Sequence, residues 1–389
     1  MPVINRIADF QADMTAWRRD LHAHPETAFE EHRTADIVAQ LLESFGIAVE
    51  PGIARTGVIG TLTGSRPGGR AIALRADMDA LPIEEKTGLP HASRHPGRMH
   101  ACGHDGHTAM LLGAAKYLAE TRNFAGTVYF IFQPAEENEG GARVMIEEGV
   151  LDRYPVEALY GMHNWPGLPV GQFAIRPGPM MAAYDIFEIN VQGRGAHAAL
   201  PHFGIDPIVA AAQIVNGLQT IASRNIDPLE GAVVSVTQIQ GGDTWNVIPD
   251  AVVLRGTTRS FAPSVRDALE PAIHRVAEGI CAALGAQMTM RYERRYPPTV
   301  NSLAETEIAA STAAALVGGD NVRRDLLPSM GAEDFAWFLE KKPGAYIWIG
   351  NGAGPDRAMP HNPHYDFNDE ILTLGASYWA RLAETVLER

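Results

Sequence analysis

The stretch of the chain with the most chemical potential is His100-Ala101-Cys102-Gly103-His104-Asp105-Gly106-His107. It holds three histidines and one of the two cysteines of the chain. In an extended segment, residues two apart point the same way, so Cys102 and His104 could bind one metal ion or a pair of ions. Clusters of Cys and His in an intracellular chain favour metal binding or catalysis. A polar loop that caps the helix expected at 108–120 is the alternative.

Two further polar motifs follow apolar, strand-like runs. Asp77 and Asp79 come after the run 71–75, and His163 comes after the run 158–162. Open α/β sheets place their functional sites at the carboxyl ends of strands. These side chains are therefore candidates for the same site, although a solvated loop and a structural histidine are the plainer interpretations.

A pair of adjacent glutamates, Glu136 and Glu137, follows the apolar run 127–133 and precedes a helix expected at 142–148. Adjacent side chains cannot point in one direction, so one carboxylate could bind metal while the other stays free as a proton carrier. Acidic side chains are also favoured at a helix N-terminus by the helix dipole, which is the structural alternative.

The elements that must position these motifs alternate between strands and helices in both outer parts of the chain. Helices are expected at 3–22, 30–45, 108–120, 142–148, 305–317, 333–340 and 369–388. Buried strands are expected at 57–62, 71–75, 127–133, 158–162 and 345–349. This order predicts an α/β fold, with a discontinuous catalytic domain built as an α/β/α sandwich from residues 1–179 and 295–389.

Residues 180–294 have a different pattern. The segment 184–192 alternates apolar and polar residues, as an antiparallel strand does. Helices and strands then follow at 207–223, 232–240, 251–258, 264–284 and 286–294. The order β-α-β-β-α-β is the ferredoxin-like arrangement, which predicts an inserted domain.

The inserted domain carries polar, glycine-rich loops of its own. His197 lies in the segment 193–202, Asn246 lies in the segment 241–250, and Arg259 ends a strand. Glycine lets a backbone approach a ligand or another chain closely. Glycine-rich surface turns are the alternative.

Composition limits the partners of the protein. The 389 residues carry 32 basic and 46 acidic side chains, a net charge of −14, which argues against nucleic acid or an anionic membrane as a partner. Two cysteines far apart make no disulfide framework, which suits a reducing compartment. Without an apolar leader or a run of 18 or more apolar residues, a cytoplasmic protein is expected.

Taken in order, the motifs resemble those of the two-metal aminoacylase-type amidohydrolases and carboxypeptidases. The branch of hippurate hydrolases and auxin–amino-acid-conjugate hydrolases is the most similar. Many ordered motifs over almost the whole chain make this resemblance far more specific than one short motif. The segments that carry it are RRDLHAHPE (18–26), RADMDALP (75–82), HACGHDGHTAMLLGAA (100–115), QPAEENEGGA (133–142), GMHNWPG (161–167), GRGAHAALPH (193–202), GGDTWNVIPD (241–250), SMGAEDFAWF (329–338) and HNPHYDFND (361–369).

The resemblance implies two divalent metal ions (Mn, Zn, Co or Ni). The ligands that it implies are Cys102, His104, Glu137, His163 and His361. Cys102 takes the bridging position that an aspartate fills in the wider superfamily, whose His-x-Asp motif is replaced here by Asp77-Met78-Asp79. Supporting roles are implied for Asp77, Asp105 and His107, and His22 and His24 are implied to be non-ligands.

The resemblance also implies a mechanism. Glu136 matches the carboxylate that takes a proton from the metal-activated water and passes it to the departing amine. His197 matches the residue that donates to the developing oxyanion, often across a dimer interface. Asn246 and Arg259 match positions that receive the free carboxylate of the substrate. The inserted domain would be both lid and dimerisation domain, in a homodimer or homotetramer.

The predicted function is hydrolysis of the amide bond of a small N-acyl amino acid, hippurate-like or N-acetyl, to a carboxylic acid and an amino acid. A dipeptidase or carboxypeptidase of the same family is the alternative within the class. A non-catalytic metal-binding protein on this fold is the alternative from another class. A protein that had lost turnover would be expected to lose the unligated acid, but Glu136 is present.

Overall fold

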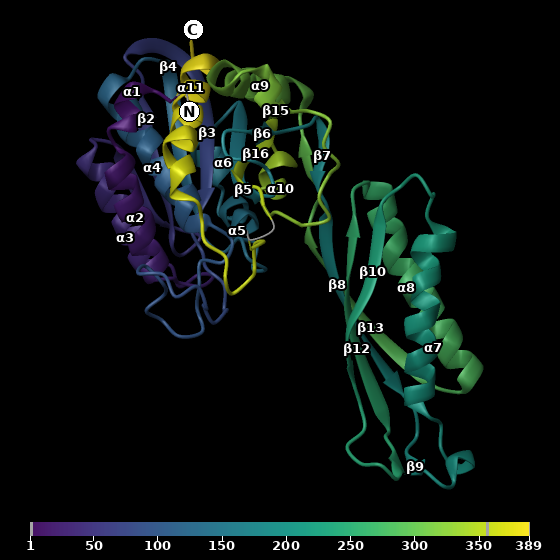
Figure 1. Ribbon diagram of the computed structural model, residues 1–389. Helices are drawn as coiled ribbons and strands as arrows, with labels where there is room; N and C mark the ends of the chain where they lie inside the picture. Colours follow the sequence, from purple (N-terminus) through teal and green to yellow (C-terminus); the bar gives the residue numbers. More distant parts are fainter. Residues whose placement is uncertain (1–2, 355–357, 389) are drawn as a thin grey trace. The chain divides into compact units, whose positions relative to one another are not determined.

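The computed structural model describes residues 3–354 and 358–388 and divides into two compact units (Figure 1). The larger unit comprises residues 1–180, 300–327 and 334–389. The inserted unit comprises residues 181–299 and 328–333. Within the described ranges, no helix has both the length and the hydropathy that a membrane span requires.

A mixed sheet forms the centre of the larger unit (Figure 1). Among the described residues its eight strands lie in the order β1 (Ala48–Ile53), β2 (Gly57–Thr63), β4 (Ala125–Gln133), β3 (Arg66–Asp77), β5 (Ala158–Pro166), β16 (Gly344–Gly352), β6 (Phe173–Ala174) and β15 (Val322–Arg323). The four central strands, β4, β3, β5 and β16, are parallel to one another. At one edge of the sheet, β2 is antiparallel to both of its neighbours, β4 and β1. The carboxyl ends of the central strands therefore share one edge of the sheet, where polar motifs that follow them can meet.

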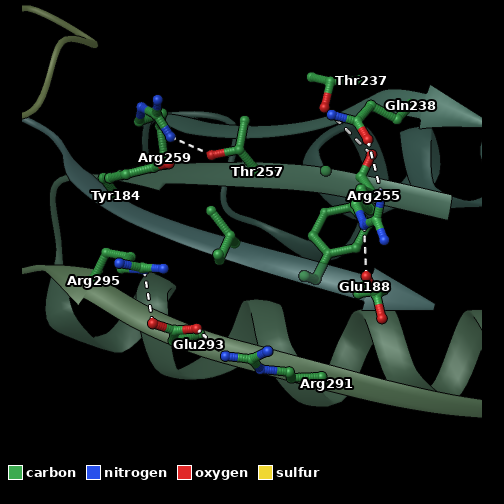
Figure 2. Close-up of a pocket in the computed structure, with 13 residues that line it drawn as sticks. Tyr184, Glu188, Thr237, Gln238, Arg255, Thr257, Arg259, Arg291, Glu293 and Arg295 are labelled. Atoms are coloured by element: carbon green, nitrogen blue, oxygen red, sulfur yellow. Dashed lines mark hydrogen bonds and ion pairs between the residues drawn. The ribbon is translucent and has the colours of Figure 1, made fainter. Parts of the chain in front are cut away.

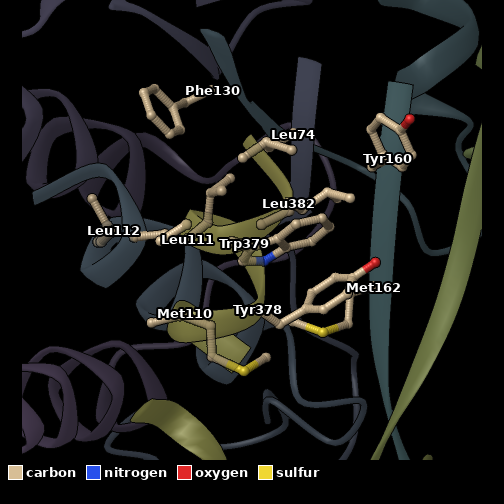
Figure 3. Packing of buried hydrophobic residues seen from close by; sticks show 14 of the residues in the cluster. Leu74, Met110, Leu111, Leu112, Phe130, Tyr160, Met162, Tyr378, Trp379 and Leu382 are labelled. Carbon is tan, nitrogen blue, oxygen red and sulfur yellow. The ribbon is translucent and has the colours of Figure 1, made fainter. Parts of the chain in front are cut away.

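Helices cover both faces of this sheet. The described helices of the larger unit are α1 (Asn5–Ala8), α2 (Gln11–Ala23), α3 (His32–Ser44), α4 (His104–Thr121), α5 (Gly141–Glu147), α6 (Val150–Arg153), α9 (Leu303–Val317), α10 (Ala336–Leu339) and α11 (Leu372–Val386). All nine residues of β16 are buried, which requires cover on both faces. On one face, Trp379 of α11 packs in the same apolar cluster as Leu74 of β3 and Met110 of α4 (Figure 3). On the other, the rings of Phe335 and Tyr346 lie 5.4 Å apart.

The inserted unit contains the predicted β-α-β-β-α-β order. Its elements are β8 (Ala183–Gln192), α7 (Pro207–Thr220), β10 (Ala232–Gln240), β12 (Ala251–Ser260), α8 (Pro263–Leu284) and β13 (Gln287–Tyr296). The strands pair antiparallel in the order β10-β12-β8-β13, the ferredoxin-like topology. The alternating residues Phe187, Ile189 and Val191 of β8 pack in an apolar cluster with α7 and α8. The predicted α/β fold class with this insertion is confirmed.

Several elements differ from the expected ones. The helix expected at 3–22 is broken after Ala8 into α1 and α2. The helix expected at 333–340 is reduced to the four residues of α10, and the backbone N–H of Asp334 before it donates to Glu136. Short elements not expected are β7 (Gly178–Met181), β9 (Ala196–His197), β11 (Val247–Ile248) and β14 (Thr299–Asn301), together with β1, β6 and β15.

Candidate metal centre

The stretch around Cys102 is not extended, which corrects the expected geometry. Helix α4 begins at His104, and Gly103 before it has a left-handed φ of 95°. A Cβ on Gly103 would lie 2.4 Å from Nδ2 of Asn164, so both backbone and packing require glycine there. This turn, rather than an extended i, i+2 alternation, brings Cys102 and His104 together.

Two groups of potential ligands overlap at Cys102. Cys102, His104 and His163 form the first group, and Cys102, Glu137 and His361 form the second. Within each group the ligand atoms all lie within 4.8 Å of one another. The Sγ of Cys102 lies 3.4 Å from Nε2 of His163, and Nε2 of His361 lies 3.1 Å from Oε1 of Glu137. Two groups that share one member can hold two ions with a bridging ligand.

Each of the two buried imidazoles His104 and His163 uses Nδ1 in a hydrogen bond, which leaves Nε2 as the nitrogen that could bind a metal. Nδ1 of His163 donates to the carbonyl oxygen of Asn164 at 2.6 Å, and Nδ1 of His104 donates to Oδ1 of Asp79 at 3.2 Å. The Nε2 of His104 is buried and has no hydrogen-bond partner among the described residues. Burial, followed by the charge of nearby His107, lowers the pKa of His163 and keeps it neutral. Burial acts to lower the pKa of His104, but the charges of Asp77 and Cys102 raise it well above its usual value, so a bound cation must displace a proton from that ring.

The sulfur and carboxylate ligands complete a mixed donor set. Burial and the charge of Glu137 raise the pKa of the Cys102 thiol, so a bound cation must displace its proton. Burial acts to raise the pKa of Glu137, but the hydrogen bond from His361 holds that pKa below its usual value. One sulfur, three imidazole nitrogens and a carboxylate suit borderline divalent ions of the transition series.

Asp79 orients two of these ligands at once, a role that its place in the sequence did not reveal. Its Oδ1 accepts from His104, and its Oδ2 accepts the backbone N–H of Glu137 at 2.9 Å. Asp79 is buried at the carboxyl end of β3. One carboxylate therefore fixes a ligand from α4 and a ligand from the loop after β4.

Replacing Asp79 with Asn should lower metal affinity by about 10–100-fold, the usual effect of losing such an outer partner. An asparagine offers only one acceptor oxygen, whereas His104 and Glu137 each present a donor to Asp79. Competition with a chromophoric chelator measures the affinity, with the exposed Asp320 replaced by Asn as the matched control. Equal affinities in both variants would show that Asp79 does not orient the ligands.

His107 supports the centre without an unused nitrogen of its own. Its Nδ1 lies 2.6 Å from Oδ1 of Asp77, and its Nε2 accepts the backbone N–H of Asn164 at 2.9 Å. Asp77 in turn accepts from Arg75 at 2.6 Å. Although Asp77, His104 and His107 are close enough to hold an ion, both nitrogens of His107 are engaged.

Asp105 and His22 belong to a buried ionic cluster behind the ligands. Oδ2 of Asp105 forms an ion pair with Nε of Arg18 at 2.9 Å and accepts a hydrogen bond from Nδ1 of His22 at 2.8 Å, and all three side chains are fully buried. Burial opposes the charge on His22, but its hydrogen bonds to Asp105 and Glu85 raise its pKa to about 9. His22 therefore forms a hydrogen bond with Asp105 and belongs to neither of the two ligand groups.

Glu136 lies beside the ligand groups but outside the two that share Cys102. Its carboxylate is within ligand distance of His104 and Glu137, and its Oε1 accepts the backbone N–H of Asp334 at 3.2 Å. The side chain is only 6% exposed. The preceding Ala135 has a left-handed φ of 55° in the turn that follows β4.

The conformation of this loop depends on Glu31, a buried residue that the sequence did not single out. Its Oε1 accepts the backbone N–H groups of Phe29 at 3.1 Å and Ala135 at 2.9 Å. Its Oε2 accepts from Thr56 at 2.5 Å. Burial, followed by the charge of Asp79, raises the pKa of Glu31 to about 7. Glu31 therefore connects, through hydrogen bonds, the segments that contain Phe29, Thr56 and Ala135, the last of which precedes Glu136.

Replacing Glu31 with Ala should destabilise the protein by about 2–4 kcal/mol, because two backbone N–H groups lose their acceptor. Replacing it with Gln should retain stability, since the amide oxygen can accept both N–H groups and the amide nitrogen can donate to Thr56. Burial raises the pKa of Glu31 from the ordinary 4.5 to about 7 in the folded state, so the contribution of Glu31 to the free energy of unfolding declines as pH rises from about 4.5 toward about 7. Urea denaturation across that range should show this decline in the wild type and not in E31Q. Equal stability of E31A and the wild type would contradict the assignment.

In the inserted unit, His197 and Asn246 lie at the same end of the sheet. β9 pairs with β11 so that His197 is opposite Val247, and the N–H of Ala198 donates to the carbonyl of Asn246 at 2.9 Å. The exposed ring of His197 accepts the N–H of Ala199 at Nδ1, 3.1 Å away. The neutral ring therefore carries its proton on Nε2, where it can donate to a ligand.

Arg259 lies near the opposite end of β12, in a cavity of about 460 Å³ on the sheet (Figure 2). At about 3.3 Å per residue, Ala251 and Arg259 are roughly 25 Å apart along the strand. The guanidinium stacks 4.3 Å from the ring centre of Tyr184 and donates to the carbonyl of Thr258 at 2.9 Å. The structure therefore does not bring Arg259 to Asn246 within one chain.

The arginines that line this cavity differ in their ion pairing. Arg255 pairs with Glu188 at 2.6 Å, and Arg291 pairs with Glu293 at 2.7 Å (Figure 2). Arg259 has no ion pair among the residues that the structure describes. An unpaired, half-buried guanidinium in a cavity is suited to bind a carboxylate.

A mixed α/β sheet with a buried donor cluster at its strand ends, interrupted by a ferredoxin-like insertion, defines the class of two-domain metallohydrolases. Residues 73–385 match the model of the Peptidase family M20/M25/M40. The chain belongs to this family, which confirms the resemblance seen in the motifs.

Curated relatives and a solved structure agree with this assignment. The chain is 46% identical to the N-acetylcysteine deacetylase of Bacillus subtilis over 97% of its own length and 98% of that protein. It is 40% identical to the hippurate hydrolase of Campylobacter jejuni, with 98% and 99% covered. The crystal structure of the Bacillus subtilis YXEP protein, described as a dinuclear metal binding peptidase, matches with a TM-score of 0.84 and 42% identity over 98% of this chain and 99% of that one.

Proposed function

We propose that this protein hydrolyses the amide bond of N-acyl amino acids to a carboxylic acid and an amino acid, with two divalent metal ions. The observation that carries the proposal is the pair of ligand groups that share Cys102, with Glu136 beside them. The full-length similarity to a deacetylase and a hippurate hydrolase supports this substrate class.

The residues of the centre have two roles, metal binding and proton transfer. His104 and His163 would hold one ion and Glu137 and His361 the other, with Cys102 shared between them. Bound there, two divalent ions supply Lewis acidity and a water of lowered pKa. Glu136 takes the proton of the attacking water and delivers it to the nitrogen that leaves as the free amine. Its hydrogen bond from Asp334 holds the carboxylate in place for both transfers.

The inserted unit supplies the groups that recognise the developing charge and the substrate carboxylate. His197 donates through Nε2 to the oxyanion, and Asn246 and Arg259 bind the carboxylate. Because Asn246 and Arg259 lie at opposite ends of β12, a site that uses both needs them from two chains. We therefore propose a homodimer in which His197 and Asn246 of one chain complete the site that contains Arg259 of the other.

A substrate panel tests the proposed function. Metal-depleted protein is supplied with Mn, Zn, Co or Ni and incubated with N-acetyl and N-benzoyl amino acids and with dipeptides, and released amine is quantified. Hydrolysis of N-acyl amino acids with at least one metal is the expected result. Hydrolysis of dipeptides alone would replace the proposal with a peptidase, and no hydrolysis with any metal would overturn it. We also propose that the protein is cytoplasmic, because its two cysteines are free, as a reducing compartment favours.

A further inference from the structure

A buried arginine of α2 joins segments of the larger unit that are far apart in the chain. Arg18 is fully buried, and a guanidinium in such a place requires acidic partners. Among the described residues, its Nε lies 2.9 Å from Asp105, its Nη1 lies 3.5 Å from Asp369, and its Nη2 donates to Asp366. Asp105 belongs to the first turn of α4, whereas Asp366 and Asp369 come just before α11. One side chain of α2 therefore links the start of α4 to the segment that precedes α11.

The segment that precedes α11 carries the candidate metal ligand with the least support from regular structure. His361 lies in the range 358–368, which contains no helix or strand. Its side chain is 53% exposed, whereas Cys102, His104 and His163 are buried. Its φ of 65° is left-handed, a conformation that a residue other than glycine keeps where its surroundings hold it. The place of His361 in its ligand group therefore depends on the contacts that fix this segment.

Two of these contacts are a backbone hydrogen bond and a close packing of one ring. The backbone N–H of His361 donates to the carbonyl of Ala101 at 2.8 Å. The ring of Phe367 packs against Gly106 of α4 so closely that a Cβ on the glycine would lie 2.3 Å from the ring. The segment 358–368 therefore packs against the start of α4.

Arg18 supplies the ionic contact between the same two parts of the chain. Asp366 is the one acidic side chain of the segment 358–368, and its Oδ1 accepts from Arg18. Nε of the same guanidinium is paired with Asp105, which directly follows the candidate ligand His104. A planar guanidinium holds two carboxylates at a fixed angle, which the ammonium of a lysine does not. Arg18 therefore sets the spacing between the start of α4 and the segment that carries His361.

We propose that Arg18 is a positioning residue of the metal centre, which holds His361 in the ligand group of Cys102 and Glu137 through its ion pair with Asp366. The inference rests on the two-ion centre of the proposed function. Arg18 belongs to neither ligand group, so it acts on the ion through His361.

The other ligand group is held by different contacts. Nδ1 of His104 donates to Asp79, and Nδ1 of His163 donates to the carbonyl of Asn164. Neither hydrogen bond involves Asp366. Loss of the ion pair between Arg18 and Asp366 should therefore weaken the binding of one ion and spare the other.

Titration of the metal-depleted protein with Co²⁺, followed by calorimetry and absorption, tests this role. The wild type should bind two equivalents, and His361→Ala identifies the ion that depends on His361. In D366A that ion should bind about tenfold or more weakly, the usual effect of losing an outer partner, while the affinity for the other should change less than about twofold. R18K should show the same loss, because a lysine keeps the charge beside Asp105 but lacks the fork that also reaches Asp366. Equal weakening of both ions, or unchanged binding in D366A and R18K, would overturn the inference.

Three further variants separate positioning from general stability. Asp366→Glu keeps a carboxylate near Arg18 and should recover most of the affinity that D366A loses. Arg19→Ala is the matched control, because it removes an exposed ion pair of the neighbouring residue with Asp369 and should leave both ions unchanged. The double variant R18K/D366A should bind the ion at His361 within about twofold of either single variant, since both substitutions remove one contact. Additive losses would mean that Arg18 and Asp366 act separately and would overturn the inference.

Metal binding is measured without substrate, so this inference and the proposed function can fail separately. If the protein binds two ions but hydrolyses no N-acyl amino acid, the proposed function fails, and a loss in D366A that is confined to one ion still supports the role of Arg18. If the wild type hydrolyses the substrate and D366A binds both ions as the wild type does, the proposed function stands and the role of Arg18 is overturned.

Discussion

Glu136→Gln is expected to reduce kcat by about 10²–10⁴-fold while the protein retains its full metal content. The glutamine keeps the shape of the side chain and can still accept the N–H of Asp334, so the loop should not change. It cannot take a proton from water, and the leaving nitrogen then has no donor. The measurement pairs steady-state kinetics with metal analysis by mass spectrometry.

The adjacent residue provides the matched control for this variant. Glu137→Gln removes a carboxylate that lies with Cys102 and His361 in one ligand group, so it should lose metal as well as activity. The two variants differ by one position in the chain but should differ in metal content. Loss of metal from E136Q with retention in E137Q would mean that the two glutamates exchange roles.

His197→Ala is expected to lower kcat by about 10²–10³-fold, the usual cost of removing one donor to an oxyanion. Its Nδ1 already accepts from Ala199, so the Nε2–H is the donor that the substitution removes. The ring is exposed at the tip of the inserted unit, so the melting temperature should not change. A variant with wild-type turnover would remove His197 from the mechanism.

Complementation between variants tests whether His197 acts across a dimer. H197A and R259A should each be nearly inactive alone, but a mixed dimer contains one site with both residues intact. Random exchange makes about half of the dimers mixed, so activity should recover to about one quarter of the wild type. An inactive mixture would place His197 and Arg259 in the site of the same chain.

The candidate ligands could be predicted from the sequence because each follows a recognisable motif. His163 lies in the second half of β5 and Glu137 follows the end of β4 by four residues, and parallel strands bring such positions to one edge of the sheet. The order of the motifs along the chain then carried the resemblance to the family. The position of His361 could be predicted only from that resemblance, because no strand or helix pattern surrounds it.

Other parts of the site depend on backbone contacts that a sequence does not display. Glu31 and Asp79 act by accepting N–H groups from distant loops, and any buried carboxylate could have done so. The left-handed turn at Gly103 packs against Asn164 and leaves no room for a Cβ. The separation of Asn246 and Arg259 follows from the length of β12 and became visible only once the strand was placed. These are tertiary effects, whereas strand-end motifs are local.

The most direct test of the account is a metal titration of the depleted protein during hydrolysis of its best N-acyl amino acid substrate. Two ligand groups that share Cys102 predict that activity rises to a plateau at two equivalents of metal per chain. Cys102→Ser should require more metal to reach any plateau, because a hydroxyl is a poorer bridging ligand than a thiolate. Full activity in the depleted protein, or a plateau at one equivalent, would contradict a two-metal centre built on Cys102.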